Sequence, residues 1–118
     1  MDKWQAQQAF WESFGLDAYN ENTVPTGTPM PYITYEASAS GLGNRLSLTA
    51  SIWYRDSSWK AISNKAKEIL DEIADGKTFS YDGGGMIIWG NRADDMSEPT
   101  DDMVRRIRLD VTIEFIGG

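Results

Sequence analysis

Charged side chains gather in two short stretches of this sequence, and these are the first candidates for chemistry or recognition. The positive stretch consists of Arg105, Arg106 and Arg108. The negative stretch consists of Asp94, Asp95, Glu98, Asp101 and Asp102. Clustered carboxylates can bind calcium, but the EF-hand spacing, with its central glycine and terminal Glu, is missing. We therefore expect the acidic stretch to be a solvated loop. A contact with a partner is the second interpretation, and a site for a divalent ion is the least favoured.

The arginines have two interpretations. Arg106 and Arg108 fall on the polar face of a predicted strand, whereas Arg105 points to its other face. They are either solvated residues paired with Glu36 or Asp110, or a row that contacts another protein. The second interpretation has a physical basis, because the planar guanidinium binds carboxylates bidentately and arginine is enriched at interfaces. Such a row could meet the acidic stretch 94–102 of the next copy.

Two other patterns point weakly to chemistry. The run from Asp82 to Gly85 contains three glycines, but a phosphate-binding loop needs Gly-Lys-Ser/Thr at the start of a helix, and here a strand follows. A tight turn is the better interpretation, because glycine tolerates positive φ. Acidic residues on strands could also suggest a glycosidase pair, yet no spacing separates them from an ordinary polar sheet face; they are Glu36, Asp56, Asp110 and Glu114.

The sequence contains no cysteine and no histidine. Disulfides, thiolate metal sites and nucleophiles activated by histidine are therefore excluded. The side chain whose ordinary pKa lies nearest neutrality is absent as well, which removes most general-base chemistry. We predict that the chain is not an enzyme and needs no cofactor.

The formal net charge is −7. A charge of this sign opposes binding to nucleic acid and to anionic membranes. The residues from Met1 to Gln5 lack the basic and apolar regions of a signal peptide, and no apolar run approaches the roughly 20 residues that span a bilayer. We expect a cytoplasmic protein that contacts other proteins.

Hydrophobic periodicity predicts a single α+β domain over residues 1–118. We expect one mainly antiparallel sheet of four to five strands, with two main helices packed on one face. Residues 17–30 and 91–102 lack a periodic apolar pattern and are expected to be mobile loops or arms. The expected helices span 2–14 and 59–75, and the expected strands span 31–38, 46–56, 86–89 and 104–116, with 78–81 as a further candidate.

The two helices differ in what their apolar residues indicate. The stripe on 59–75 is narrow and predicts a helix that covers a sheet; it comprises Trp59, Ile62, Ala66, Ile69, Leu70 and Ile73. The aromatic residues of 2–14 either pack on the chain's own core or present a surface to a neighbour. Trp53 and Arg55 lie on an otherwise polar strand face. Either the N-terminal helix, residues 17–30 or a partner should therefore cover them.

Several phrases of the sequence resemble one protein family. They are Pro31-Tyr32-Ile33-Thr34-Tyr35-Glu36, the run 46–55 (LSLTASIWYR), Ser58-Trp59-Lys60, and 101–108 (DDMVRRIR) before an alternating strand. Together they are similar to tail terminator proteins of long-tailed bacteriophages, also called tail completion or tail-to-head joining proteins. The similarity covers roughly residues 30–116 and rests on the order of the phrases.

The resemblance implies a structural role in the virion, at the junction of tail and head, after assembly in the host cytoplasm. It implies a ring, expected to be a hexamer, that caps the tail tube and stops its growth. The implied partners are further copies of the chain, the tail tube protein and head-closure or connector proteins. Alternatives are another neck or tail component, such as a head-closure or tail tube protein, and a small ligand-binding domain.

Overall fold

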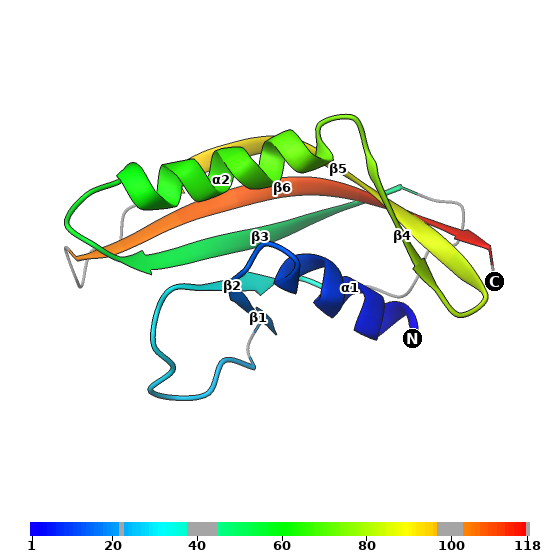
Figure 1. Cartoon of the computed structure of the whole chain (residues 1–118), viewed down its shortest axis with the longest axis horizontal. Helices are drawn as coiled ribbons and strands as arrows, with labels where there is room; N and C mark the ends of the chain where they lie inside the picture. The colour runs from blue at the N-terminus through cyan, green and yellow to red at the C-terminus, as the bar shows by residue number, and fades with distance from the viewer. Residues whose placement is uncertain (22, 38–44, 97–102, 118) are drawn as a thin grey trace.

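The computed structural model describes residues 1–21, 23–37, 45–96 and 103–117. Figure 1 shows two helices lying against one long sheet. In chain order the elements are α1 (Lys3–Glu12), β1 (Asp17–Asn20), β2 (Tyr32–Tyr35), β3 (Arg45–Arg55), α2 (Lys60–Ile73), β4 (Lys77–Tyr81), β5 (Gly84–Met96) and β6 (Val104–Gly117).

The sheet differs from the α+β fold expected from the sequence. Among the described residues it has six strands in the order β1-β2-β3-β6-β5-β4, and β1 pairs with β2 in parallel. The register of β5 on β6 shifts between Gly90 and Arg92. Counting the two halves of β5 separately gives seven strand segments. Strands hold 49% of the residues, so a predominantly β, curled mixed sheet replaces the expected sheet of four to five strands.

Strict alternation explains the two long central strands. Along β6 the odd positions from Ile107 to Phe115 are buried, while the even positions between them are half exposed. β6 pairs with β3 over eleven residue pairs, from Arg45↔Glu114 to Arg55↔Val104. Because side chains alternate between the two faces, one face of this pair is apolar and the other polar.

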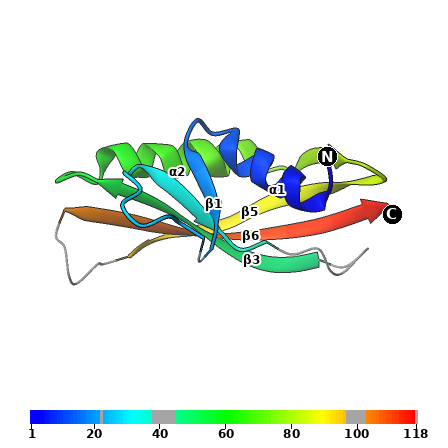
Figure 2. The ribbon, with the colours of Figure 1, turned by 90° about the horizontal axis from the view of Figure 1, so that it is seen from below.

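Helix α2 covers the apolar face. Its buried residues are Ile62, Ala66, Ile69 and Ile73, which confirms that the predicted stripe faces the core. No side chain caps its first residue, although the Ser58 hydroxyl accepts a hydrogen bond from the Lys60 amide at 3.0 Å. Gly76 follows the helix with φ of 88° and donates to the Ile73 carbonyl. Figure 2 shows α2 along one side of the curled sheet.

Helix α1 packs on the same apolar face, where it contacts both outermost strands, β1 and β4. The Asp2 side chain accepts a hydrogen bond from the Gln5 amide, and the Gln5 side chain accepts one from the Asp2 amide. These two bonds form the predicted capping box at the start of the helix. Trp11 stacks on Tyr35 of β2 with ring centroids 6.1 Å apart, and Phe10 meets Phe79 of β4 edge-on. Most of its aromatic residues therefore belong to the chain's own core.

Two segments expected to be loops contain strands. Residues 17–20 form β1, and residues 91–96 continue β5 to Met96. The polar sequence of both segments hides their strand character, because pairing with a neighbouring strand rather than an apolar stripe stabilises them. The mobility expected for the rest of these segments stays a prediction.

Candidate interaction surface on the outer face of the sheet

The sheet has an outer face, which we define as the face opposite the two helices. Its residues are Tyr19 of β1, Tyr32 and Thr34 of β2, the odd positions of β3, the even positions of β6 and, beyond the register shift, Arg92, Asp94 and Met96 of β5. None of the described helices or strands packs over this face, and in Figure 2 both helices lie on the opposite side. Side chains here contact one another across the strands, so the face is ordered before any partner binds.

Aromatic rings and an arginine form one row across four strands. The Arg106 guanidinium lies 4.7 Å from the centre of the Trp53 ring, and its Nε donates to Ser51 Oγ at 3.1 Å. Tyr32 lies 6.3 Å from Trp53, and Tyr19 lies 5.9 Å from Tyr32. We call these four residues, Tyr19, Tyr32, Trp53 and Arg106, the aromatic row.

The Trp53 indole is held in place from both sides. Its Nε1 donates a hydrogen bond to Thr34 Oγ1 at 2.9 Å, and Arg106 stacks on its ring. A ring fixed in this way loses little further side-chain entropy when a partner binds. Rigid aromatic and arginine side chains of this kind dominate binding energy at protein interfaces.

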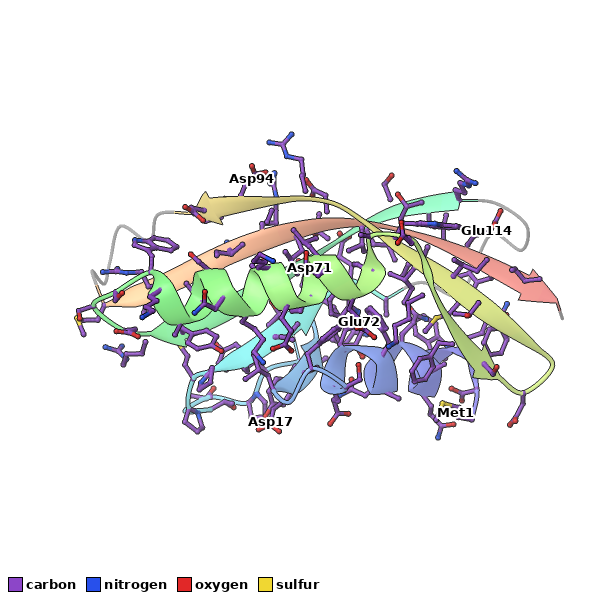
Figure 3. The ribbon with its side chains drawn as sticks, turned by 45° about the horizontal axis from the view of Figure 1, so that its top comes forward. Met1, Asp17, Asp71, Glu72, Asp94 and Glu114 are labelled. Atoms are coloured by element: carbon purple, nitrogen blue, oxygen red, sulfur yellow. The ribbon has the colours of Figure 1, made fainter. Side chains whose placement is uncertain are left out.

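A second row consists of alternating charges on β5 and β6. Arg108 Nη2 lies 3.3 Å from Asp94 Oδ2, and its Nε lies 3.7 Å from Asp110 Oδ1. Arg92 reaches the same two carboxylates, at 2.9 Å from Asp94 and 3.7 Å from Asp110. We call Arg92, Asp94, Arg108 and Asp110 the charge row; Figure 3 shows Asp94 near the end of β5.

The ion pairs within the charge row shift the pKa values of Arg92 and Asp94. The hydrogen bond from Arg92 is the largest cause that lowers the pKa of Asp94, with Arg108 adding to it and partial desolvation opposing it. The same bond to Asp94 raises the pKa of Arg92. Arg92 is exposed and Asp94 only half-buried, so solvent screens these contacts and they order the surface more than they stabilise the fold.

The remaining predicted site residues are spread apart. Arg105 turns to the helix side, where it lies 5.3 Å from the Trp59 ring centre and donates to the Ser57 carbonyl. Arg55 is exposed at the end of β3, opposite Val104. Asp95 points to the helix side, because its neighbour across the strands is the buried Ile107. Glu98, Asp101 and Asp102 lie outside the described residues.

On the outer face, the structure thus brings four of the predicted residues into contact with unpredicted ones; they are Trp53, Asp94, Arg106 and Arg108. Arg108 pairs with Asp110, as one sequence interpretation proposed, but Glu36 instead accepts from the Thr49 amide and hydroxyl. Arg92, Tyr19 and Tyr32 were missed. Tyr32 was detectable, since alternation already placed it on the same strand face as Thr34, whereas Arg92 sat in a predicted loop.

The outer face is suited to recognition. One hollow on this face has a volume of about 210 Å³ and is lined by polar and aromatic groups that include Thr34, Ser51, Trp53 and Arg106. Among the described residues, no three acidic side chains converge as they would around a metal ion. Likewise, none of the described helices is long and apolar enough to cross a bilayer.

Comparison with known proteins identifies a fold. No protein-family model matches the sequence, and no curated protein matches it either. Among solved structures, a chain from the virion of a native gene transfer agent particle superimposes with a TM-score of 0.63. The two chains share 17% sequence identity, and the match covers 95% of this chain and 90% of the other. At this identity the likeness shows that both chains have the same fold along almost their whole length.

Proposed function

We propose that this chain is a structural protein of a phage-like virion, and that within the virion it acts as a tail terminator. The observation that carries the proposal is the fold shared with a chain of a gene transfer agent virion over nearly the full length of both chains. The match covers 95% of this chain and 90% of the other, so the whole chain, and not one part of it, has the fold of that virion protein. The sequence phrases that resemble those of tail terminator proteins favour this particular role within the virion.

The physical character of the surface supports a structural role. Rigid side chains on an open sheet face present a recognition surface, and the interactions within the aromatic and charge rows keep it ordered before assembly. The absence of histidine and cysteine removes the commonest catalytic groups. These features favour a protein that binds other proteins and catalyses nothing.

As a terminator, the chain would form a ring on the end of the tail tube. Such a ring uses two different patches of each copy, one for each neighbour. Its two faces would contact the tube protein and the head connector. Trp53, Arg55, Arg106 and Arg108 on the outer face, together with Asp94, are the residues we propose for contacts with copies or partners.

Two related roles make different predictions about location. A head-closure protein would lie on the head side of the joint, and a tube protein would lie along the whole tail. A small ligand-binding domain would not be part of the particle.

Immunogold electron microscopy tests this proposal in the particles made by the genome that encodes the chain. Antibody against the whole 118-residue chain should label one site per particle, where tail meets head. Detached tails should carry the label at one end, and detached heads should carry none. Label along the tail would identify a tube protein, label on detached heads a head-closure protein, and absence from purified particles would overturn the virion role.

A further inference from the structure

Residues 92–96, the last part of β5, form an open sheet edge. β4 pairs with β5 only from Gly84 to Ile88, whereas β6 lies along the other side of β5 as far as Met96. None of the described residues makes a backbone hydrogen bond to the free side of 92–96. In Figure 3 this part of β5, with the labelled Asp94, runs along the margin of the molecule. An unpaired edge of this kind is a template for another strand.

The described chain leads away from this edge at both of its ends. A Cβ built on Gly76 would lie 2.6 Å from the Trp89 indole, so the chain between α2 and β4 passes the strand before residue 92. Beyond Met96, the next described residue is Met103, whose carbonyl accepts a hydrogen bond from the Asp56 amide at 2.8 Å. Asp56 follows β3, which lies on the far side of β6 from β5. Neither of these described segments covers the free side of 92–96.

The outer side of the edge carries an arginine and an aspartate, two residues apart. Arg92 lies opposite Asp110 of β6, and Asp94 lies opposite Arg108. When two antiparallel strands pair, residues directly opposite each other lie on the same face of the sheet. Two identical edges related by a two-fold axis at Ala93 would therefore place Arg92 of each copy opposite Asp94 of the other. The edge is complementary in charge to itself.

The helix side of the edge carries an apolar groove. It has a volume of about 310 Å³ and lies between α2 and β5. Its apolar lining residues are Ala66, Leu70, Ala93 and Ile107. Ala93 is exposed, and its small side chain allows another strand to approach closely. On α2, at the rim of the groove, Lys67 is already paired with Asp71 at 2.7 Å. A second copy that paired with the edge would bring a matching groove beside this one.

We propose that two free copies of this chain pair their β5 edges in antiparallel fashion about a two-fold axis at Ala93. The sheet then continues from one copy into the other, with the helices of both copies on the same side. The centre of the interface is Ala93 of both copies, flanked on the outer face by two pairs of Arg92 with Asp94. This dimer goes beyond the proposed virion role and does not depend on it.

Charges alternate across the whole joint in this arrangement. Counted across the strands, one row begins with Arg108 and Asp94 of one copy and continues with Arg92 and Asp110 of the second copy. The two-fold axis repeats this row in the opposite direction. Each of these charges on β5 thus lies between opposite charges on both neighbouring strands, which is the favourable arrangement for cross-strand pairs.

Charge also selects this register over the nearest alternatives. Because side chains alternate between faces, the joint can shift only in steps that keep the two outer faces together. An axis at Arg92 would place the two Arg92 side chains opposite each other, and an axis at Asp94 would do the same with two aspartates. Like charges directly opposite are destabilising. With the axis at Ala93, the two Asp95 residues lie roughly 14 Å apart along the strands, at about 3.4 Å per residue.

The regular part of the joint is short, so its side chains have to supply much of its stability. The register of β5 on β6 shifts between Gly90 and Arg92, which limits regular pairing between copies to 92 with 94, 93 with 93, and 94 with 92. The joint also brings the two apolar grooves together about the axis, so that Leu70 and Ile107 of both copies become less accessible to water. Burial of apolar surface then adds to the pairing of charges.

The joint stops at two copies, because pairing uses the one edge that each copy contributes. It is therefore distinct from the head-to-tail contacts of a ring. With the axis perpendicular to the sheet, the outer faces of both copies stay uncovered, including Trp53 and Arg106. The residues that we propose for contacts in the virion remain available while the dimer protects the edge against uncontrolled pairing.

Disulfide trapping tests the register directly, because the natural chain has no cysteine. In the variant A93C the two introduced thiols lie across the axis from each other, where opposite Cα atoms of an antiparallel pair are about 4.5–5.5 Å apart. A disulfide needs Cα atoms within about 7 Å. Mild oxidation should therefore convert A93C into a covalent dimer on denaturing gels.

Two further cysteine variants serve as controls. M96C lies on the same edge, but in the proposed register positions 96 of the two copies are roughly 20 Å apart, at about 3.4 Å per residue. A61C carries the same substitution as A93C on an exposed position of α2. Both controls should stay monomeric on denaturing gels under the conditions that trap A93C.

A second measurement needs no cysteine. Sedimentation equilibrium of the natural chain should show a dimer. The variant A93E places two like charges opposite each other at the axis and should lower the association constant of the dimer about tenfold or more. A61E makes the same change in charge on exposed α2 and should have a much smaller effect. Circular dichroism should show that each variant is folded.

The results that overturn the dimer differ from those that overturn the virion role. A natural chain with no dimer up to its solubility limit, no covalent dimer from A93C, or equal covalent dimer from A93C and its two controls would each contradict the joint. None of these results changes where antibody labels the particle. Conversely, label along the whole tail would remove the terminator role and leave the dimer in place.

Discussion

At the residue scale, the outer face shows charges that are already paired within one chain. Arg108 contacts both Asp94 and Asp110, and Arg106 stacks on Trp53. Alternation along β6 was enough to place both arginines on one face. It could not show that Asp94 joins them, because the residues after Gly90 read as an acidic loop. Their strand conformation depends on pairing with β6, and Arg108 offsets the charge of Asp94 there.

The pairing of Asp94 predicts a pH dependence of stability. Its pKa is lowered in the folded chain, so the carboxylate contributes stability above the ordinary aspartate pKa of about 3.9, and the contribution is lost as pH falls through the folded value. Urea unfolding at pH 7 should show D94N less stable than the natural chain. The gap should narrow below about pH 4 and shrink with added salt. A gap that widened in acid would contradict the assignment.

At the element scale, the approach of α2 to the sheet determines which residues are tolerated. A Cβ built on Gly90 of β5 would lie 2.8 Å from Leu70 Cδ2 and 2.9 Å from Ile73 Cγ1. The same atom on Gly85 would lie 3.5 Å from the Phe79 carbonyl oxygen, an ordinary contact. Helix α2 thus sits so close to β5 that a side chain at position 90 would force Leu70 and Ile73 to shift.

These contacts predict different outcomes for two identical substitutions. G90A should destabilise the chain by about 1–3 kcal/mol, because the added methyl group overpacks the junction of α2 and β5. G85A should change the free energy of unfolding much less. Chemical denaturation of both variants provides the comparison. Equal effects would mean that α2 lies farther from β5 than described.

The core beneath α2 gives a second prediction at this scale. Ile69 is fully buried, so I69A should lower the free energy of unfolding by about 2–5 kcal/mol through lost burial and the cavity left behind. S63A, on the same helix but exposed, is the control and should have a small effect. A loss below about 1 kcal/mol for I69A would place the helix stripe outside the core.

The long elements could be predicted from the sequence because each carries its own period. The alternation of β6 and the stripe of α2 placed both elements to within two residues at each end. β1 could not be predicted, since its four residues have no apolar pattern and depend on parallel pairing with β2 and on Gln8. The predicted number of strands was wrong for the same reason. Short or polar strands take their structure from a neighbour.

At the scale of the whole molecule, the net charge of −7 would oppose the proposed association of copies. Local complementarity offsets this repulsion where basic and acidic residues oppose each other. We propose the arginines of the outer face as one place where such complementarity would act. The aromatic row lies on the same face and supplies the rigid apolar surface that charges alone do not provide.

Charge reversal on the outer face tests its role in assembly. R106E combined with R108E should leave a folded chain, since neither residue is in the core, but should impair ring formation or tail joining. K60E combined with K67E makes the same change in net charge on exposed positions of α2 and should assemble normally. Circular dichroism checks folding, and native mass spectrometry checks assembly. Normal rings and infectious particles from the arginine variant would make these residues ordinary surface.

The central claim is that this chain terminates a tail and joins it to a head. The most direct test is the tail-length distribution, measured by electron microscopy, in particles from the encoding genome with this gene deleted. We predict unattached heads together with tails of variable and excessive length, because nothing stops the tube from polymerising. Restoring the gene should restore one length. Tails of normal length joined to heads in the deletion would contradict the account.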